Sequence, residues 1–135
     1  MLIVATVLVF YTVLMLAVHL SSWKLMESWH SAGKTWAKRW FPSHRAVRFE
    51  AAYWLIALIG WPLWGPFAAI VVAVFGAIHI GLWIGLEVKR MRSSLSMADN
   101  FSNRTVMFAV ATFDFVECFA LAVAGYSAAL YLFHR

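Results

Sequence analysis

The chain has 135 residues, of which 64% are hydrophobic, only 13% are charged and eight are tryptophan. An average soluble chain is about 45–50% apolar and about 25% charged, and a soluble domain this small buries only about two-thirds of its unfolded surface. The composition therefore excludes an ordinary soluble domain and a disordered chain, and the single cysteine, Cys118, excludes a disulfide scaffold. We expect an all-α integral membrane protein that forms one membrane domain.

The net charge of +5 comes from eleven basic residues against six acidic ones. Nearly all the basic residues gather in two segments, residues 24–48 and 89–104, and long apolar runs border each segment. Basic loops between spans mark the cytoplasmic side of a membrane protein, where they also meet anionic lipid. No nucleic-acid recognition motif accompanies the charge, so the expected partners are membrane lipids and not nucleic acid.

The first predicted transmembrane helix covers about residues 1–21. This run carries no charge and is long enough to cross about 30 Å of hydrocarbon. A cleaved signal peptide would have a positive charge before the apolar run, whereas the first basic residue, Lys24, follows it. We therefore expect a permanent helix with its N-terminus outside.

A basic amphipathic helix is predicted next, over about residues 24–40. On a helical wheel Trp29, Trp36 and Trp40 form one face. Lys34 and Lys38 lie on the opposite face, and Arg39 lies at the boundary. This composition is typical of a helix lying flat in the headgroup region, although packing against the protein's own helices is the alternative.

The apolar run from residue 51 to residue 86 is too long for one perpendicular span. Two prolines and a glycine interrupt it in the sequence Trp61-Pro-Leu-Trp64-Gly-Pro, which predicts a turn flanked by interfacial tryptophans. We expect a second span over about 47–61 and a third over about 66–88. A single kinked helix is the alternative, but it would put the two basic segments on opposite sides of the membrane.

The fourth predicted span covers about residues 105–133, which completes four spans with both termini outside. The third span carries a stripe of small residues at four-residue spacing, which favours close approach of another helix from this chain or from another subunit. The predicted helix-packing residues are Ala69, Ala73, Ala77, Gly81 and Gly85.

Three ionisable residues lie inside the predicted spans, and such residues are costly in lipid and usually face the bundle interior. His79 is in the third span, and Asp114 and Glu117 share one face of the fourth. Three roles are open for these residues: a structural pair, a proton or cation relay, and a metal site. The metal site is the least favoured, because the sequence lacks the paired-ligand spacings that would complete it. His19 is expected at a different depth from His79, which argues against bis-histidine haem ligation.

No nucleotide-binding, hydrolase or metalloprotease motif is present, so we predict no enzyme activity for the chain on its own. The leading prediction is an accessory subunit of a larger membrane complex in energy transduction or membrane oxidation. The alternatives are a small homo-oligomeric transporter or channel using Asp114 and Glu117, and a redox subunit in which His79 binds haem or pigment. The expected location is a bacterial or archaeal cytoplasmic membrane, with bound lipids and other membrane subunits as partners.

Overall fold

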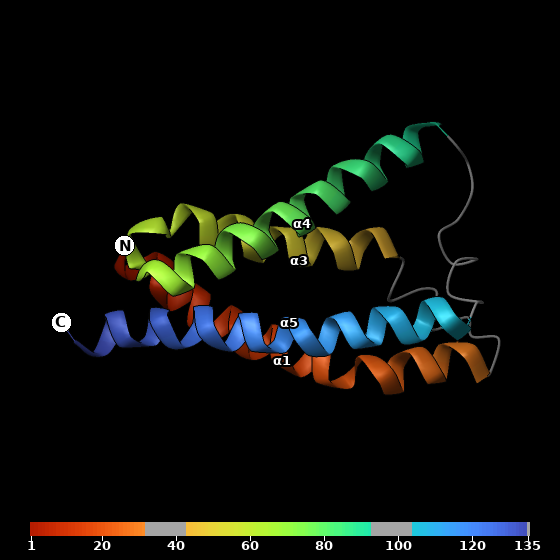
Figure 1. Cartoon of the computed structure of the whole chain (residues 1–135), viewed down its shortest axis with the longest axis horizontal. Helices are drawn as coiled ribbons and strands as arrows, with labels where there is room; N and C mark the ends of the chain where they lie inside the picture. The colour runs from red at the N-terminus through yellow and green to blue at the C-terminus, as the bar shows by residue number, and fades with distance from the viewer. Residues whose placement is uncertain (32–42, 93–103, 135) are drawn as a thin grey trace.

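The computed structural model describes residues 1–31, 43–92 and 104–134, and this part of the chain is helical with no strands. Figure 1 shows the elements in chain order, namely helices α1 (Leu2–Ser31) and α3 (Ser43–Ile59), the short 3-10 helix η1 (Trp61–Leu63), and helices α4 (Pro66–Arg92) and α5 (Arg104–Phe133).

The four long helices run along one common direction and alternate in polarity (Figure 1). Both chain ends lie at the same end of the bundle as the turn between α3 and α4. The end of α1, the start of α3, the end of α4 and the start of α5 lie at the other end, which we call the connector end. Helix α1 packs mainly against α5, and α3 packs mainly against α4.

Within the part of the chain that the structure describes, three helical stretches are long and apolar enough to cross a membrane: Leu2–Ser21, Pro66–Gly85 and Phe108–Phe133. The outward side of the bundle is consistent with lipid contact, because large apolar side chains cover it. Ile3 and Phe10 on α1 are 79% and 73% exposed, and Phe115 on α5 is 72% exposed. Large apolar side chains exposed in such number mark contact with a membrane or with another protein.

The turn between α3 and α4 is a true hairpin and not a kink in one helix. Helix α3 ends at Ile59, and α4 begins at Pro66, where the missing N–H and fixed φ of proline suit the first helical position. The Trp64 indole N–H donates to the Ala57 carbonyl at 2.9 Å and so satisfies an acceptor in the last turn of α3. Trp61 at the same turn is half exposed.

Helix α1 continues without a break through the position where the sequence predicts the first span to end. The predicted boundary was at residues 21–24, but α1 extends to Ser31, and no glycine or proline interrupts that stretch. Trp29 therefore lies on α1 and not on a separate helix. The rest of the predicted interfacial segment, including Lys34, Trp36, Lys38, Arg39 and Trp40, lies outside the described residues.

The close helix contact within the bundle is between α1 and α5. Ala120, Ala124 and Ala128 on α5 repeat every four residues and are fully buried in the core. On the same helix Gly125 is so close to α1 that a Cβ there would lie 2.5 Å from Thr12 Cγ2. These small residues allow the two backbones to approach closely.

The small-residue stripe predicted on α4 does not make such a contact with the described chain. Ala69 and Ala73 are half-buried, whereas Ala77, Gly81 and Gly85 are exposed. A Cβ added at Gly81 or Gly85 would meet no described heavy atom within 4 Å. If this part of the stripe packs against a helix, that helix is not among the described residues.

Candidate functional site

One buried carboxylate is hydrogen-bonded by residues from the three other long helices. Glu117 on α5 is fully buried, and its Oε1 accepts a hydrogen bond from the Trp54 indole of α3 at 2.7 Å. Its Oε2 lies 3.1 Å from His19 Nε2 of α1 and 3.0 Å from His79 Nε2 of α4. We call these four residues the Glu117 centre.

The orientation of both imidazoles is set by their own helices. The Nδ1 atom of His19 lies 2.8 Å from the Met15 carbonyl oxygen, and Nδ1 of His79 lies 2.7 Å from the Phe75 carbonyl oxygen. Because a carbonyl only accepts, Nδ1 carries the hydrogen in both rings. The Nε2 atoms are thereby fixed as the ones that face Glu117.

This arrangement determines how many hydrogens the Glu117 centre needs. With both Nδ1 atoms protonated, each contact between an Nε2 atom and Oε2 is a hydrogen bond only if one more hydrogen lies between the two atoms. When both contacts are satisfied, His19, His79 and Glu117 together carry one net positive charge. Removing a hydrogen leaves lone pairs facing each other, so the centre favours a bound cation, either a proton or an ion that replaces it.

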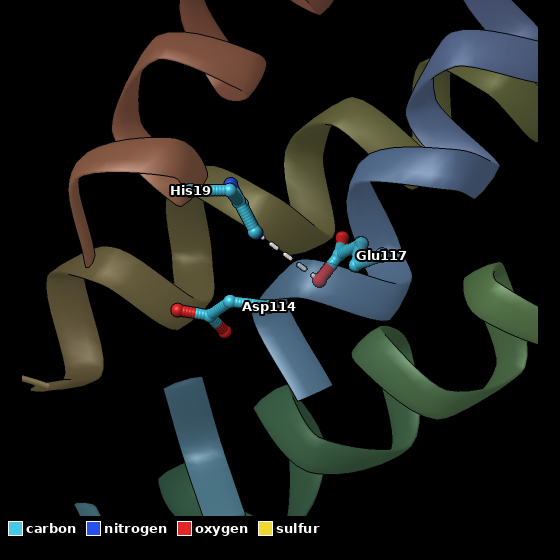
Figure 2. A group of neighbouring side chains, drawn as sticks. All are labelled: His19, Asp114 and Glu117. Atoms are coloured by element: carbon cyan, nitrogen blue, oxygen red, sulfur yellow. Dashed lines mark hydrogen bonds and ion pairs between the residues drawn. The ribbon is translucent and has the colours of Figure 1, made fainter. Parts of the chain in front are cut away.

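Two further carboxylates lie next to the centre. Glu50 Oε1 of α3 is 3.9 Å from His19 Nε2, and its side chain is 22% exposed, compared with 1% for His19 and Glu117. Asp114, one turn before Glu117, offers a carboxylate oxygen that lies with the ligand atoms of His19 and Glu117 inside a 4.8 Å group (Figure 2). The negative charges of these carboxylates offset the positive charge of the Glu117 centre. Glu50 is partly exposed and so lies between the buried centre and the bundle surface.

Aromatic rings enclose the centre on the side of His79. The Trp54 ring stacks on the His79 imidazole with ring centroids 5.8 Å apart, and the Phe113 ring lies 5.9 Å from the same imidazole. Phe75 stacks on Trp54 at 5.4 Å. Together these rings hold His79 and Trp54 in place and keep water away from one side of Glu117.

Among the described residues, most side chains buried between the centre and the α3–α4 turn are apolar. The side chains buried there include Ala5, Leu8, Ala57, Leu63 and Ala128. Among the described residues, the buried polar or charged side chains are Thr12 and the three ionisable members of the Glu117 centre. Thr12 Oγ1 lies 2.8 Å from the Tyr53 hydroxyl, so it already has a hydrogen-bond partner. The ionisable neighbours of the centre that the structure describes, Glu50 and Asp114, lie toward the connector end.

The structure brings together the three polar residues that the sequence predicts inside the spans, and it adds further residues to the same site. His79 and Glu117 are in direct contact, and Asp114 lies one turn away. The predicted mismatch in depth between His19 and His79 is wrong, because both imidazoles reach the same oxygen. A first helix that ended near residue 21 would place His19 at the membrane surface, whereas α1 extends to Ser31 and His19 lies well inside it.

Sequence reasoning missed His19, Glu50 and Trp54 as members of this site. Glu50 is an acidic residue that closely follows the first basic segment and precedes an apolar run. Trp54 is a tryptophan inside a predicted span, away from the interfaces where this residue is common. Neither feature identifies a member of the site unless the packing of the helices is known.

Comparison with known protein families, with characterised proteins and with solved structures finds no match to this chain, so the geometry of the Glu117 centre itself must support any functional assignment.

Proposed function

We propose that this protein is a small membrane transporter that binds a cation at the Glu117 centre. The observation that supports this proposal is the fully buried Glu117 carboxylate, which two imidazoles from separate helices share and which the partly exposed Glu50 adjoins. A buried charge inside a lipid-facing bundle is costly, and such groups commonly mark ion pathways.

The proposal includes four spans, with α3 as the fourth. Helix α3 has 17 residues and is shorter than the other three, but it lies antiparallel to α4 along most of its length (Figure 1). Arg48 near its start pairs with Glu87 of α4 at 2.6 Å, at the connector end. Basic side chains there can reach the headgroups and so shorten the apolar length that α3 must supply.

We further propose that the connector end faces the cytoplasm and that residues 24–40 contribute an interfacial segment there. The described parts of the two basic segments are the last turns of α1 and α4 and the first turns of α3 and α5, which lie at this end of the bundle, in agreement with the positive-inside rule. Both chain ends and the α3–α4 turn then lie outside.

An alternating carrier fits the core better than an open channel does. The carboxylates next to Glu117, namely Glu50 and Asp114, lie toward the connector end. The described side chains buried in the opposite half of the bundle are mostly apolar and include no ionisable group. A cation that reaches Glu117 from the connector end therefore needs a second conformation to leave on the other side.

Cation flux in proteoliposomes tests the proposal. Glu117→Gln keeps the size of the side chain and removes its charge, so we expect flux to fall to the level of empty vesicles. Glu87→Gln is the matched control, because Glu87 pairs with Arg48 outside the Glu117 centre, and it should retain most of the flux. Equal flux in the wild-type protein and in Glu117→Gln would contradict the transporter proposal.

An accessory subunit of a larger membrane complex is the second candidate. It is favoured by the exposed α4 face at Ala77, Gly81 and Gly85, where a neighbouring helix could approach closely. Gentle extraction followed by native mass spectrometry would identify associated subunits. Recovery of the chain alone or only with copies of itself would contradict this candidate.

Haem or pigment ligation by His79 has less support. Both ring nitrogens of His79 are already hydrogen-bonded, and aromatic side chains pack around the ring. A ligated iron or magnesium would have to replace the bond to Glu117. Visible absorption of the purified protein would identify such a group directly.

A further inference from the structure

We propose that the cation bound at the Glu117 centre is a divalent transition-metal ion, with His19 Nε2 and the carboxylates of Asp114 and Glu117 as its ligands (Figure 2). The inference specifies the substrate of the transporter proposed above. The binding site itself rests on geometry that is independent of transport.

The distances between the donor atoms are close to those of a metal site. Ligands at about 2.1 Å from one ion are separated by about 3.0–3.4 Å when they are adjacent. His19 Nε2 and Glu117 Oε2 are 3.1 Å apart, so they already have this spacing. The chosen ligand atoms of His19, Asp114 and Glu117 all lie within 4.8 Å of one another.

A third carboxylate, that of Glu50, lies next to this group without belonging to it. Glu50 Oε1 lies 3.9 Å from His19 Nε2, on the partly exposed side of the centre. The ligand set is therefore one nitrogen and two carboxylate groups, those of Asp114 and Glu117. An imidazole among carboxylates suits Zn²⁺, Mn²⁺ or Fe²⁺ better than Mg²⁺ or Ca²⁺, which prefer oxygen ligands alone.

The surroundings of the ligands match the outer shell that metal sites need. A metal-bound histidine normally donates its other ring N–H to a carbonyl or carboxylate, and His19 Nδ1 donates to the Met15 carbonyl. Metal-bound carboxylates are usually hydrogen-bonded in turn. Glu117 accepts from Trp54 on Oε1, and His79 adjoins Oε2. His79 therefore acts in this proposal as a positioning residue for Glu117 and not as a ligand.

Metal binding requires the loss of a hydrogen. The ion takes the lone pairs of His19 Nε2 and Glu117 Oε2, so the hydrogen between these atoms leaves as a proton. Metal and proton thus compete for the same two atoms.

The experiment uses the purified full-length chain in detergent with a purification tag that contains no histidine. Co²⁺ is titrated in while its visible absorption is recorded, and Zn²⁺ is then added to displace it. We expect one ion per chain, and His19→Gln and Asp114→Asn should each weaken binding by about tenfold or more. His134→Gln, at the exposed C-terminal end of α5, and the double variant His30→Gln/His44→Gln should leave binding unchanged.

The outcomes are distinct. No saturable Co²⁺ binding, or unchanged binding in His19→Gln, would overturn the site, as would loss of binding in the His30→Gln/His44→Gln control. Circular dichroism checks that each variant is folded, and Asp114→Asn, at the partly exposed edge, provides the test if His19→Gln does not fold. Metal binding without flux would refute transport but keep the site, whereas flux without metal binding would refute the site alone.

Discussion

At the scale of single residues, Glu117 has an unusually demanding environment. Both oxygens of its carboxylate are used, and each donor comes from a different helix. Inside a low-dielectric bundle such hydrogen bonds are strong when satisfied, and an unpaired member is correspondingly costly. The stability of the bundle and the chemistry of the site therefore depend on the same few atoms.

This dependence predicts a large stability loss for Glu117→Ala. The change leaves Trp54 and two imidazoles without their buried acceptor, and each unsatisfied group costs about 1–3 kcal/mol. We expect a loss of several kcal/mol in unfolding experiments in mixed micelles.

Glu87→Ala is the matched control for that variant. Its carboxylate pairs with Arg48, whose side chain is 45% exposed, so the loss should be about 1 kcal/mol or less. Similar losses for the two variants would contradict the role given to Glu117.

Trp54→Phe provides a second residue-scale prediction. Phenylalanine keeps most of the ring packing against His79 and Phe75 but removes the N–H that donates to Glu117 Oε1. We expect destabilisation by about 1–3 kcal/mol from the unsatisfied oxygen. The same change at Trp61, which is half exposed in the turn, should have little effect in thermal unfolding. Equal effects at both positions would argue against the hydrogen bond.

At the scale of helices, α5 and α4 use small residues differently. On α5 they are buried against α1, whereas on the second half of α4 they face outward. Both stripes have the same four-residue period in the sequence, so spacing alone does not reveal which of them packs within the chain.

This difference predicts opposite outcomes for two glycine substitutions. In Gly125→Ala the added Cβ would lie 2.5 Å from Thr12 Cγ2, so α1 and α5 must separate, and we expect a loss of about 1–3 kcal/mol. Gly81→Ala meets nothing described within 4 Å and should be neutral or slightly stabilising in the isolated protein. Thermal unfolding of both variants measures the contrast.

The companion variant Gly125→Ala/Thr12→Ala removes the atoms that the new Cβ meets first, and it should recover part of the lost stability. A Gly125→Ala protein as stable as the wild type would show that α1 and α5 are not in close contact.

At the scale of the whole molecule, the sequence predicts the all-helical class, the presence of long apolar helices and the turn before Pro66. These follow from local signals, namely apolar length, charge position and proline chemistry. The Glu117 centre could not be predicted in full, because it depends on how far α1 continues and on how four helices align. His19 and Glu50 are 31 residues apart in the sequence numbering, and no periodicity relates them. Their contact is a product of tertiary packing.

The proposed four-span topology makes a prediction for labelling in intact membranes. In a Cys118→Ala background, cysteines placed at Ser43 and Arg92 should react with an impermeant maleimide from the same side, because both lie at the connector end of the bundle (Figure 1). Cysteines at Gly65 and His134 should react from the opposite side. Labelling of Ser43 and Gly65 positions from one side would contradict a membrane-crossing α3.

The sharing of one Glu117 oxygen by two imidazoles is tested most directly by ¹⁵N NMR of protein with labelled histidine. We predict that His19 and His79 both carry hydrogen on Nδ1, and that His19→Gln shifts the Nε2 resonance of His79, because both nitrogens contact Oε2. The resonances of His134 should stay unchanged. An Nε2 resonance of His79 that does not respond to His19→Gln would contradict the shared carboxylate.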